Sequence, residues 1–250
     1  MQKHDRDNAG DDHEAIWGDM MSVLQIPKLP TGACFYKRKY RVYNEGFYLA
    51  SNKQHSMLLW GELDARKIPL SALHQFLETI PDTNHLICWF DGTSSQLKNV
   101  TTLMYFLHRT NPKSKMFKWD RVSLKYNPPG HTYMSPGPDQ AFASVSKQMK
   151  KRTIIGDPKE VLSVINDACK NCSAGWLEGD EHFDWTAYLA QFYATDNNFL
   201  RVDGQGALLR KSRWFSFGFS EVLDERTGAI LVQNDTNEIK ARLSFDANAP

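Results

Sequence analysis

Two cysteines three positions apart, Cys169 and Cys172, are the residues whose types and spacing could most readily do chemistry. Two thiols at this spacing can chelate zinc or cycle between dithiol and disulfide. Zinc needs two further ligands, and the other two cysteines, Cys34 and Cys88, stand alone. The sequence therefore favours four free and inert thiols over a metal site or a redox site.

Histidine is the next candidate, because it is the commonest general base in enzymes. Of the eight histidines, His108 and His131 have Thr, Asn or Arg neighbours that are typical of loops. Neither has a partner in the sequence, and the chain lacks a nucleophile elbow, a His-Glu-x-x-His motif and a glycine-rich phosphate loop. We therefore interpret these histidines as structural and predict no catalytic residue, no metal and no enzyme.

Two basic clusters could hold phosphates: Lys147, Lys150, Lys151 and Arg152 form one, and Lys113, Lys115 and Lys118 form the other. Basic runs of this kind are more often solvated faces. The chain has 30 Lys and Arg against 29 Asp and Glu, a net charge of +1. Because no global field attracts nucleic acid or an anionic membrane, we expect no specific nucleic-acid partner. A neutral chain with 41% hydrophobic residues is also suited to self-association.

The first residues are too charged for a signal peptide, and no apolar run approaches the length of a membrane span. We therefore expect a protein that is made and folded in the cytoplasm and has no membrane partner.

These residues need elements to position them, and the sequence predicts an α+β fold. Residues 1–26 are expected to form an N-terminal amphipathic helical arm, capped at Asp11 or Asp12 and ended by Pro27, with an apolar stripe of Ile16, Trp17, Met20, Met21 and Leu24. Such a helix could dock on its own domain or on a neighbouring molecule. Residues 27–250 are expected to be a single α+β core domain that is β-rich and sandwich-like, with several helices and an internal boundary, if there is one, in the Pro- and Gly-rich connector 127–138.

Hydrophobic periodicity places the core elements. Helices are predicted at 69–80, 95–107, 157–169 and 184–193. Strands are predicted at 56–62, 85–90, 121–126, 199–202, 207–210, 214–219, 229–233 and 239–245.

A β-hairpin is predicted before these elements. Residues 35–43 alternate aromatic with basic side chains, Asn44, Glu45 and Gly46 supply a turn, and residues 47–50 return. The segment resembles the first hairpin of the cypovirus polyhedrins, and the residues that carry the resemblance are Tyr43, Gly46, Leu49, Asn52 and Lys53. A polar N-terminal arm precedes the hairpin, as in that family. The resemblance covers roughly the first sixty residues.

The resemblance implies a structural protein of viral occlusion bodies. Such a protein packs with itself into crystals in the host cytoplasm, embeds and protects virus particles, and releases them at the alkaline pH of the insect midgut. The family also implies an N-terminal helix at contacts between subunits, no required cofactor, and nucleotide that can be trapped in the lattice. The 18 lysines and 9 tyrosines offer a release mechanism, because they titrate near pH 10.

A second resemblance gives an alternative function. Trp176, Gly179, Asp180, Phe192, Tyr193, Asp196, Phe199, Asp203 and Gly204 follow the rhythm of NTF2-like α+β cones. Members of that family bind or transform small ligands, so the alternative is a ligand-binding C-terminal region with a pocket lined by aromatic residues between 185 and 219.

Overall fold

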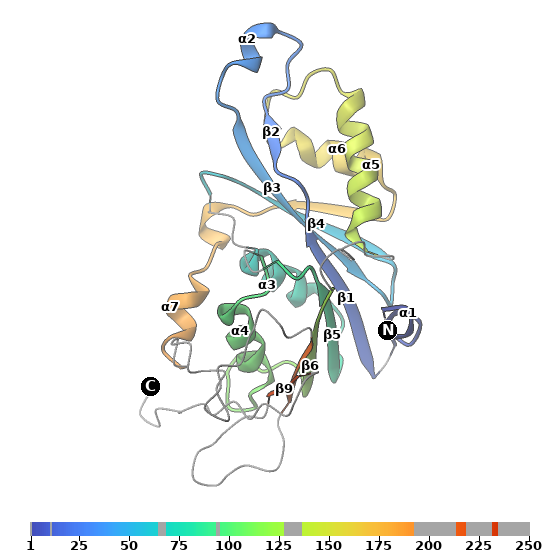
Figure 1. Cartoon of the computed structure of the whole chain (residues 1–250), viewed down its shortest axis with the longest axis vertical. Helices are drawn as coiled ribbons and strands as arrows, with labels where there is room; N and C mark the ends of the chain where they lie inside the picture. Colours follow the sequence, from blue (N-terminus) through green and yellow to red (C-terminus); the bar gives the residue numbers. More distant parts are fainter. Residues whose placement is uncertain are drawn as a thin grey trace. The chain divides into compact units, whose positions relative to one another are not determined.

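The computed structural model describes residues 2–10, 12–64, 69–93, 96–127, 137–192, 214–218 and 232–234. The chain divides into two compact units. Unit 1 comprises Met1–Ala15, Pro81–Thr132 and Asp184–Pro250, and unit 2 comprises Ile16–Ile80 and Tyr133–Phe183. Strands pair both in parallel and antiparallel, and helices are interspersed between them along the chain (Figure 1). The predicted α+β class with a β-rich core is confirmed.

Unit 2 is built on a sheet with the strand order β7-β4-β3-β1. The strands are β1 (His13–Met20, in this unit from Ile16 on), β3 (Tyr40–Leu49), β4 (Gln54–Gly61) and β7 (Cys172–Trp176), and the short β2 (Leu24–Ile26) also pairs with β3. The β4–β7 pair is parallel, whereas β1–β3, β2–β3 and β3–β4 are antiparallel. The helices of the unit are α2 (Gly32–Phe35), α3 (Leu70–Thr79), α5 (Pro138–Lys151) and α6 (Glu160–Ala168), with a 3-10 helix, η1 (Gly179–Glu181).

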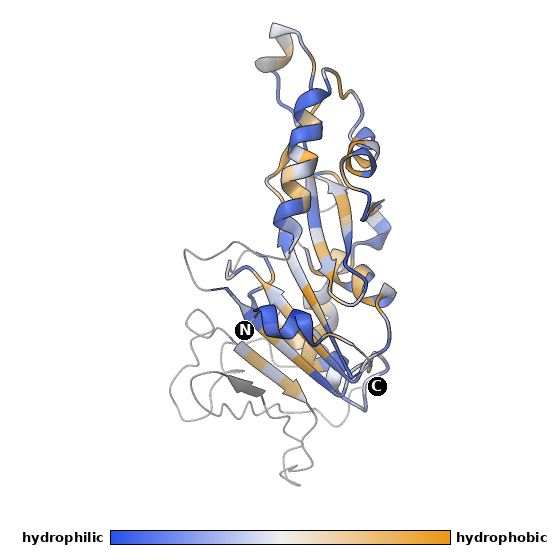
Figure 2. Cartoon of the chain, turned by 90° about the vertical axis from the view of Figure 1, so that its right-hand side faces the viewer, coloured by the Kyte–Doolittle hydropathy of each residue, from blue (hydrophilic) through white to orange (hydrophobic). Residues whose placement is uncertain are grey.

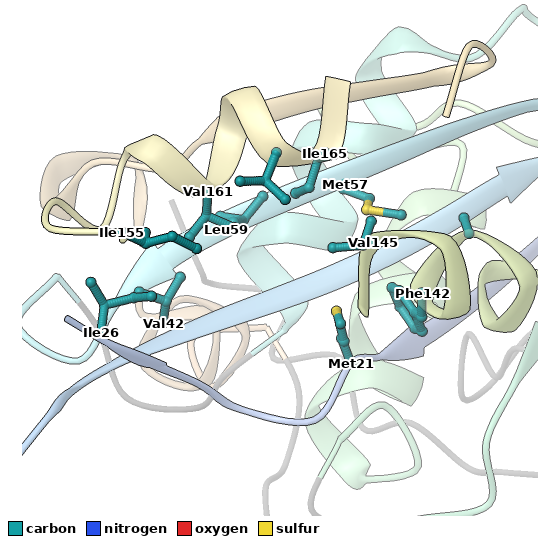
Figure 3. Close-up of a cluster of buried hydrophobic side chains, with 12 residues drawn as sticks. Met21, Ile26, Val42, Met57, Leu59, Phe142, Val145, Ile155, Val161 and Ile165 are labelled. Carbon is teal, nitrogen blue, oxygen red and sulfur yellow. The ribbon is translucent and has the colours of Figure 1, made fainter. Parts of the chain in front are cut away.

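Helices cover both faces of this sheet because its strands carry apolar side chains on both sides. On one face, Val42, Met57 and Leu59 pack against α5 and α6 in the cluster drawn in Figure 3. On the other face, the ring of Phe47 stacks on Phe76 of α3, with 4.5 Å between ring centroids. Each face removes large apolar surfaces from water, the main source of stability in a domain of this size.

The predicted N-terminal helical arm is wrong. Residues 13–20 form strand β1 instead, and Ile16 and Trp17 are fully buried in unit 2. Met20 and Met21 are also buried, and Leu24 begins the separate strand β2. A strand that is buried on both faces reads as a nearly continuous apolar run, which periodicity alone does not distinguish from a buried helix.

The predicted hairpin exists, but its turn is elsewhere. Strand β3 runs without interruption through Asn44, Glu45 and Gly46, so the turn predicted at these residues is wrong. The chain reverses instead between Leu49 and Gln54, where Asn52 Oδ1 accepts a hydrogen bond from the Gln54 amide at 3.0 Å and Lys53 has a φ of 58°. An Asx turn followed by a left-handed residue is ordinary turn chemistry, but the Asn-Glu-Gly sequence that begins eight residues earlier, at Asn44, gives a similar signal.

Unit 1 contains the strands β5 (His85–Phe90), β6 (Arg121–Tyr126), β8 (Trp214–Gly218) and β9 (Val232–Asn234). The β5–β6 pair is parallel, and β6–β8 and β8–β9 are antiparallel. Its helices are α1 (Gln2–Asp7), α4 (Val100–Thr110) and α7 (Trp185–Leu189). Helix α4 begins where the Asn99 side chain accepts a hydrogen bond from the Thr102 amide at 2.9 Å, and its Tyr105 ring packs edge-on against Trp185 of α7.

Most predicted core elements match the structure within a few residues. The strands predicted at 85–90 and 121–126 match β5 and β6, and the four predicted helices correspond to α3, α4, α6 and α7. Helix α5 was not predicted; Figure 2 shows it as a helix of mixed hydrophilic and hydrophobic residues. The strands predicted at 199–202, 207–210 and 239–245 lie outside the described residues.

Candidate anion-binding surface

One end of unit 2 is strongly basic. Residues 27–39 and residues 147–154 each carry four basic side chains and no acidic one: Lys28, Lys37, Arg38 and Lys39 in the first segment, and Lys147, Lys150, Lys151 and Arg152 in the second. We call these two segments the basic end. Figure 1 shows α2, in the first segment, standing out beyond β2 and β3 at the end of the unit where α5 terminates.

Lys28 fastens the two segments together. Its Nζ donates hydrogen bonds of 2.6 Å to the carbonyl oxygens of Met149 and Arg152, at the C-terminal end of α5. The backbones of Lys28 and Ile155 also exchange two hydrogen bonds of 2.9 Å. A cation at this place satisfies the last carbonyls of the helix and offsets the negative end of its dipole. The end of α5 would otherwise repel an anion.

Two of the remaining cations are paired. Arg38 donates to Glu62 at 2.8 Å, and Arg152 forms an ion pair with Asp167. Within the described part of the chain, no ion pair involves Lys37, Lys39, Lys147, Lys150 or Lys151. All of these lysines are exposed except Lys39, which is half-buried. Five ammonium groups therefore face solvent or a ligand from one end of the unit.

A cavity of about 310 Å³ opens in the first segment. Its lining combines apolar groups with cations and a hydroxyl: Pro27, Leu29, Thr31, Cys34, Lys37, Arg38 and Lys39. The Cys34 thiol lies 3.5 Å from the Pro27 carbonyl oxygen and is buried. The volume is at the lower end of the range of about 300–1,000 Å³ that is typical of small-ligand pockets. The lining can hold a phosphate or carboxylate by charge and an adjoining apolar group by contact.

Unit 1 has a second polar cluster, on the face of β5, β6 and β8 that meets α1. His85 Nε2 lies 2.9 Å from Ser123 Oγ, and Arg121 Nε donates to Ser216 Oγ at 3.2 Å. Burial, and then the positive charge of Arg121, lowers the pKa of His85 to about 4. A neutral histidine beside a serine is the geometry of a base and a nucleophile. Ser123 is only 2% exposed, so a substrate cannot reach it, and we assign the pair a structural role.

The same face holds α1 in place. Asp5, which is 6% exposed, accepts hydrogen bonds from Lys125 Nζ at 2.7 Å and from Trp89 Nε1 at 2.8 Å. Gln2 also donates to Asn127 Oδ1 at 2.6 Å. A buried carboxylate with two partners is satisfied by the protein itself, so this cluster fixes the N-terminal helix of unit 1.

His108, one of the two histidines that sequence reasoning singled out, is 4% exposed on α4. Its ring packs against Phe192, and its Nε2 lies 3.5 Å from the Tyr188 hydroxyl. Burial, and then the charge of Arg109, lowers the pKa of His108 to about 4. This environment agrees with the structural interpretation. His131 lies outside the described residues.

Cys169 and Cys172 form a disulfide, so the prediction of free thiols is wrong for this pair. They lie between the end of α6 and the start of β7, where a four-residue reversal brings the two Cα atoms to 5.3 Å. Cys34 and Cys88 are free and buried, as predicted. Among the described residues, no group of three or more His, Cys, Asp or Glu side chains could hold a metal ion.

The hairpin residues that carry the polyhedrin resemblance lie on β3 and on the turn that follows it. Tyr43, Gly46 and Leu49 belong to β3, and Asn52 and Lys53 form the turn before β4. Within the NTF2-like pattern, Trp176 belongs to unit 2 and Phe192 to unit 1, and the residues from Tyr193 to Gly204 lie outside the described part of the chain.

No protein-family model, curated protein or solved structure matches this chain. In the described residues, no helix has both the length and the apolar character that crossing a membrane requires. Sequence reasoning had noted the cluster at residues 147–152 but not its partner segment. The signal that could have found the partner was the acid-free run Lys28 to Lys39, beside which the fold places the end of α5.

Proposed function

We propose that this protein binds a polyanion through the basic end of unit 2. The observation that carries the proposal is that two acid-free basic segments, more than 100 residues apart in the chain, are held side by side by the Lys28 hydrogen bonds. Net charge conceals such a surface, because acidic residues elsewhere offset it. The expectation of no specific nucleic-acid partner rested on that net charge.

The proposal is tested with the full-length protein and fluorescein-labelled heparin, measured by fluorescence anisotropy. The triple variant Lys147→Glu, Lys150→Glu and Lys151→Glu reverses three exposed charges at the end of α5. We expect it to weaken binding at least tenfold and the remaining binding to depend less on salt.

A matched control changes the net charge by the same amount elsewhere. Lys3→Glu, Lys113→Glu and Lys115→Glu reverse three exposed charges of unit 1. We expect this control to bind nearly as tightly as the wild-type protein. Equal weakening by both triple variants, or no weakening by the first, would overturn the proposal.

We also propose a second function, self-assembly into an occlusion-body lattice of the polyhedrin type. It is favoured by the five residues of the resemblance, which lie on one β-hairpin and its turn. The test is expression of the full chain in insect cells. Micrometre-sized refractile particles that dissolve above about pH 10 support this function, and a clear cytosol with soluble protein defeats it. Deletion of residues 1–25 is not a useful test, because it removes the buried strand β1 and would unfold unit 2. The NTF2-like alternative remains an expectation from the sequence.

A further inference from the structure

Tyr36 is the most exposed large hydrophobic side chain among the described residues of the basic end. It follows α2 as the C-terminal cap residue, and 87% of its surface is accessible to solvent. An aromatic ring presented to water in this way is unusual, because aromatic side chains gain stability from burial. Its neighbours along the chain are the three consecutive cations Lys37, Arg38 and Lys39, all of which line the cavity.

Positive charge beside an exposed aromatic ring is the combination with which proteins bind single-stranded nucleic acid. Ammonium groups hold the phosphates, and an aromatic face stacks on a base whatever its identity. In a duplex the base faces are already stacked on each other, so such a ring has nothing to stack on. Sulfated polysaccharides carry the charge but have no base.

We propose that the partner of the basic end is single-stranded nucleic acid, bound by stacking of a base on Tyr36 and by Lys37 and Lys39 holding adjoining phosphates at the cavity. The inference rests on the proposed polyanion-binding function and names its ligand. A flat basic face would suit an anionic membrane equally well. The cations beside Tyr36 instead line a concave site that also offers the Thr31 hydroxyl, which suits a discrete phosphate better than a bilayer surface.

Charge sets the expected salt dependence. Five lysines of the basic end form no described ion pair, so they can neutralise up to five phosphates. Each neutralised phosphate of a single strand contributes about −0.7 to the slope of log binding constant against log salt concentration. We therefore expect a slope no steeper than about −3.5. The strand would extend from α2 along the second segment, whose lysines neutralise further phosphates without stacking.

The experiment compares three fluorescein-labelled probes with the full-length protein: a 20-nucleotide oligouridylate, an RNA duplex of the same length, and heparin. We expect Tyr36→Ala to weaken oligouridylate binding by roughly 5- to 150-fold, the range for loss of one stacked base. Tyr36→Phe should bind oligouridylate as tightly as the wild-type protein, because the aromatic ring that stacks on the base is kept. Binding of the duplex and of heparin should be unchanged in both variants. Because Tyr36 is exposed, both variants should have the urea midpoint of the wild-type protein. This measurement is the control that the variants are folded.

The outcomes separate the two proposals. If none of the probes binds, both the polyanion function and this inference fail. If all three bind equally and Tyr36→Ala changes nothing, the polyanion function stands and the single-strand inference is overturned. Binding to phosphatidylserine vesicles in place of oligouridylate would also overturn the inference and identify a membrane surface as the partner.

Discussion

Gly46 shows how a single residue sets the distance between two elements. It lies in the middle of β3, where a Cβ atom would come within 2.6 Å of the Phe142 ring and 3.0 Å of the Pro138 Cβ atom. Glycine at this position therefore reflects the close approach of α5 to the sheet and not the predicted turn. We expect Gly46→Ala to lower the free energy of unfolding by about 1–3 kcal/mol, the usual cost of overpacking a core.

Urea unfolding of Gly46→Ala followed by circular dichroism tests this prediction. Gly32→Ala is the matched control in the same unit, because no atom lies within 4 Å of its Cβ position and it begins helix α2. It should be neutral or slightly stabilising. A loss at Gly46 no larger than the change at Gly32 would contradict the packing argument.

His85 makes unit 1 sensitive to acid. Its folded pKa of about 4 lies below the ordinary value of 6.5, chiefly because burial disfavours the charged ring. The unfolded chain therefore binds the proton more readily than the folded one. The contribution of His85 to the free energy of unfolding is fully present above about pH 6.5 and is lost as the pH falls from there to about 4.

We expect His85→Gln to reduce the fall in melting temperature between pH 7 and pH 4.5, measured by differential scanning fluorimetry. His4→Gln is the control, since the His4 side chain is 81% exposed. The two variants should differ in the slope of melting temperature against pH, and identical slopes would show that His85 does not carry the acid sensitivity.

At the scale of elements, α1 depends on one buried ion pair. Asp5 and Lys125 have side chains only 7% and 14% exposed. Removal of one partner leaves the other charge buried, which costs about 3–5 kcal/mol. We expect Lys125→Met to destabilise unit 1 by an amount near this range and to release α1, seen as faster amide hydrogen exchange in residues 2–7.

The exposed pair Arg6 and Asp7 lies on the same helix and provides the control. Asp7→Asn should leave the urea midpoint of unfolding almost unchanged, because exposed pairs are solvated before and after the change. If Lys125→Met proved as mild as Asp7→Asn, the ion pair would not be what fixes α1.

The disulfide joins α6 to β7. A loop of four residues contributes about 2 kcal/mol by the chain-entropy relation, less than a long loop would. We expect the Cys169→Ser and Cys172→Ser double variant to lose about this amount in urea unfolding. Thiol titration in denaturant should find two thiols before reduction and four after. Four thiols in unreduced protein, purified with rapid alkylation, would mean that the bond does not form.

The sequence predicted elements well where one face is apolar and the ends carry clear signals. Pro69 and Pro81 bracket α3, which was predicted at 69–80. The start of α4 was placed five residues too early, at 95, because the capping side chain of Asn99 was not recognised. The prediction failed for β1, where Ile16 and Trp17 are buried in a strand that is apolar on both faces. It failed for α5 because the apolar stripe of this helix is short. After Pro138, its only buried residues are Ala141, Phe142 and Val145, and its C-terminal half is mostly polar.

The candidate site was harder to predict than the elements, because its two halves are brought together by tertiary contacts. Lys28 bonds to carbonyl groups more than 120 residues away, and no local pattern encodes such a contact. The disulfide was missed for a different reason: Cys-x-x-Cys spacing is equally compatible with thiols, a metal site or a bond, and only the reversal between α6 and β7 decides it.

For the whole molecule, charge sets the behaviour in alkali. Full deprotonation of the 18 lysines and 9 tyrosines would change the net charge from +1 to −26. A net charge of this size destabilises the compact state by self-repulsion. One buried group adds a local effect: burial raises the pKa of Tyr126, whose hydroxyl donates to the Leu97 carbonyl oxygen at 3.1 Å. The folded state keeps the Tyr126 hydroxyl neutral, whereas in the unfolded chain it ionises near pH 10. The contribution of Tyr126 to the free energy of unfolding is therefore intact below about pH 10 and is lost progressively above it.

These two effects respond differently to salt, which screens long-range repulsion but not the cost of a buried phenolate. We expect the midpoint of alkaline unfolding, followed by circular dichroism, to rise when NaCl is increased from 0.05 to 1 M, where the Debye length falls to about 3 Å. Tyr126→Phe should raise the midpoint further at 1 M NaCl, whereas Tyr36→Phe, at an exposed position, should not. A midpoint that moves with Tyr126→Phe but not with salt would assign alkaline unfolding to the buried tyrosine. It would also remove charge repulsion as the basis for a lattice that dissolves in alkali.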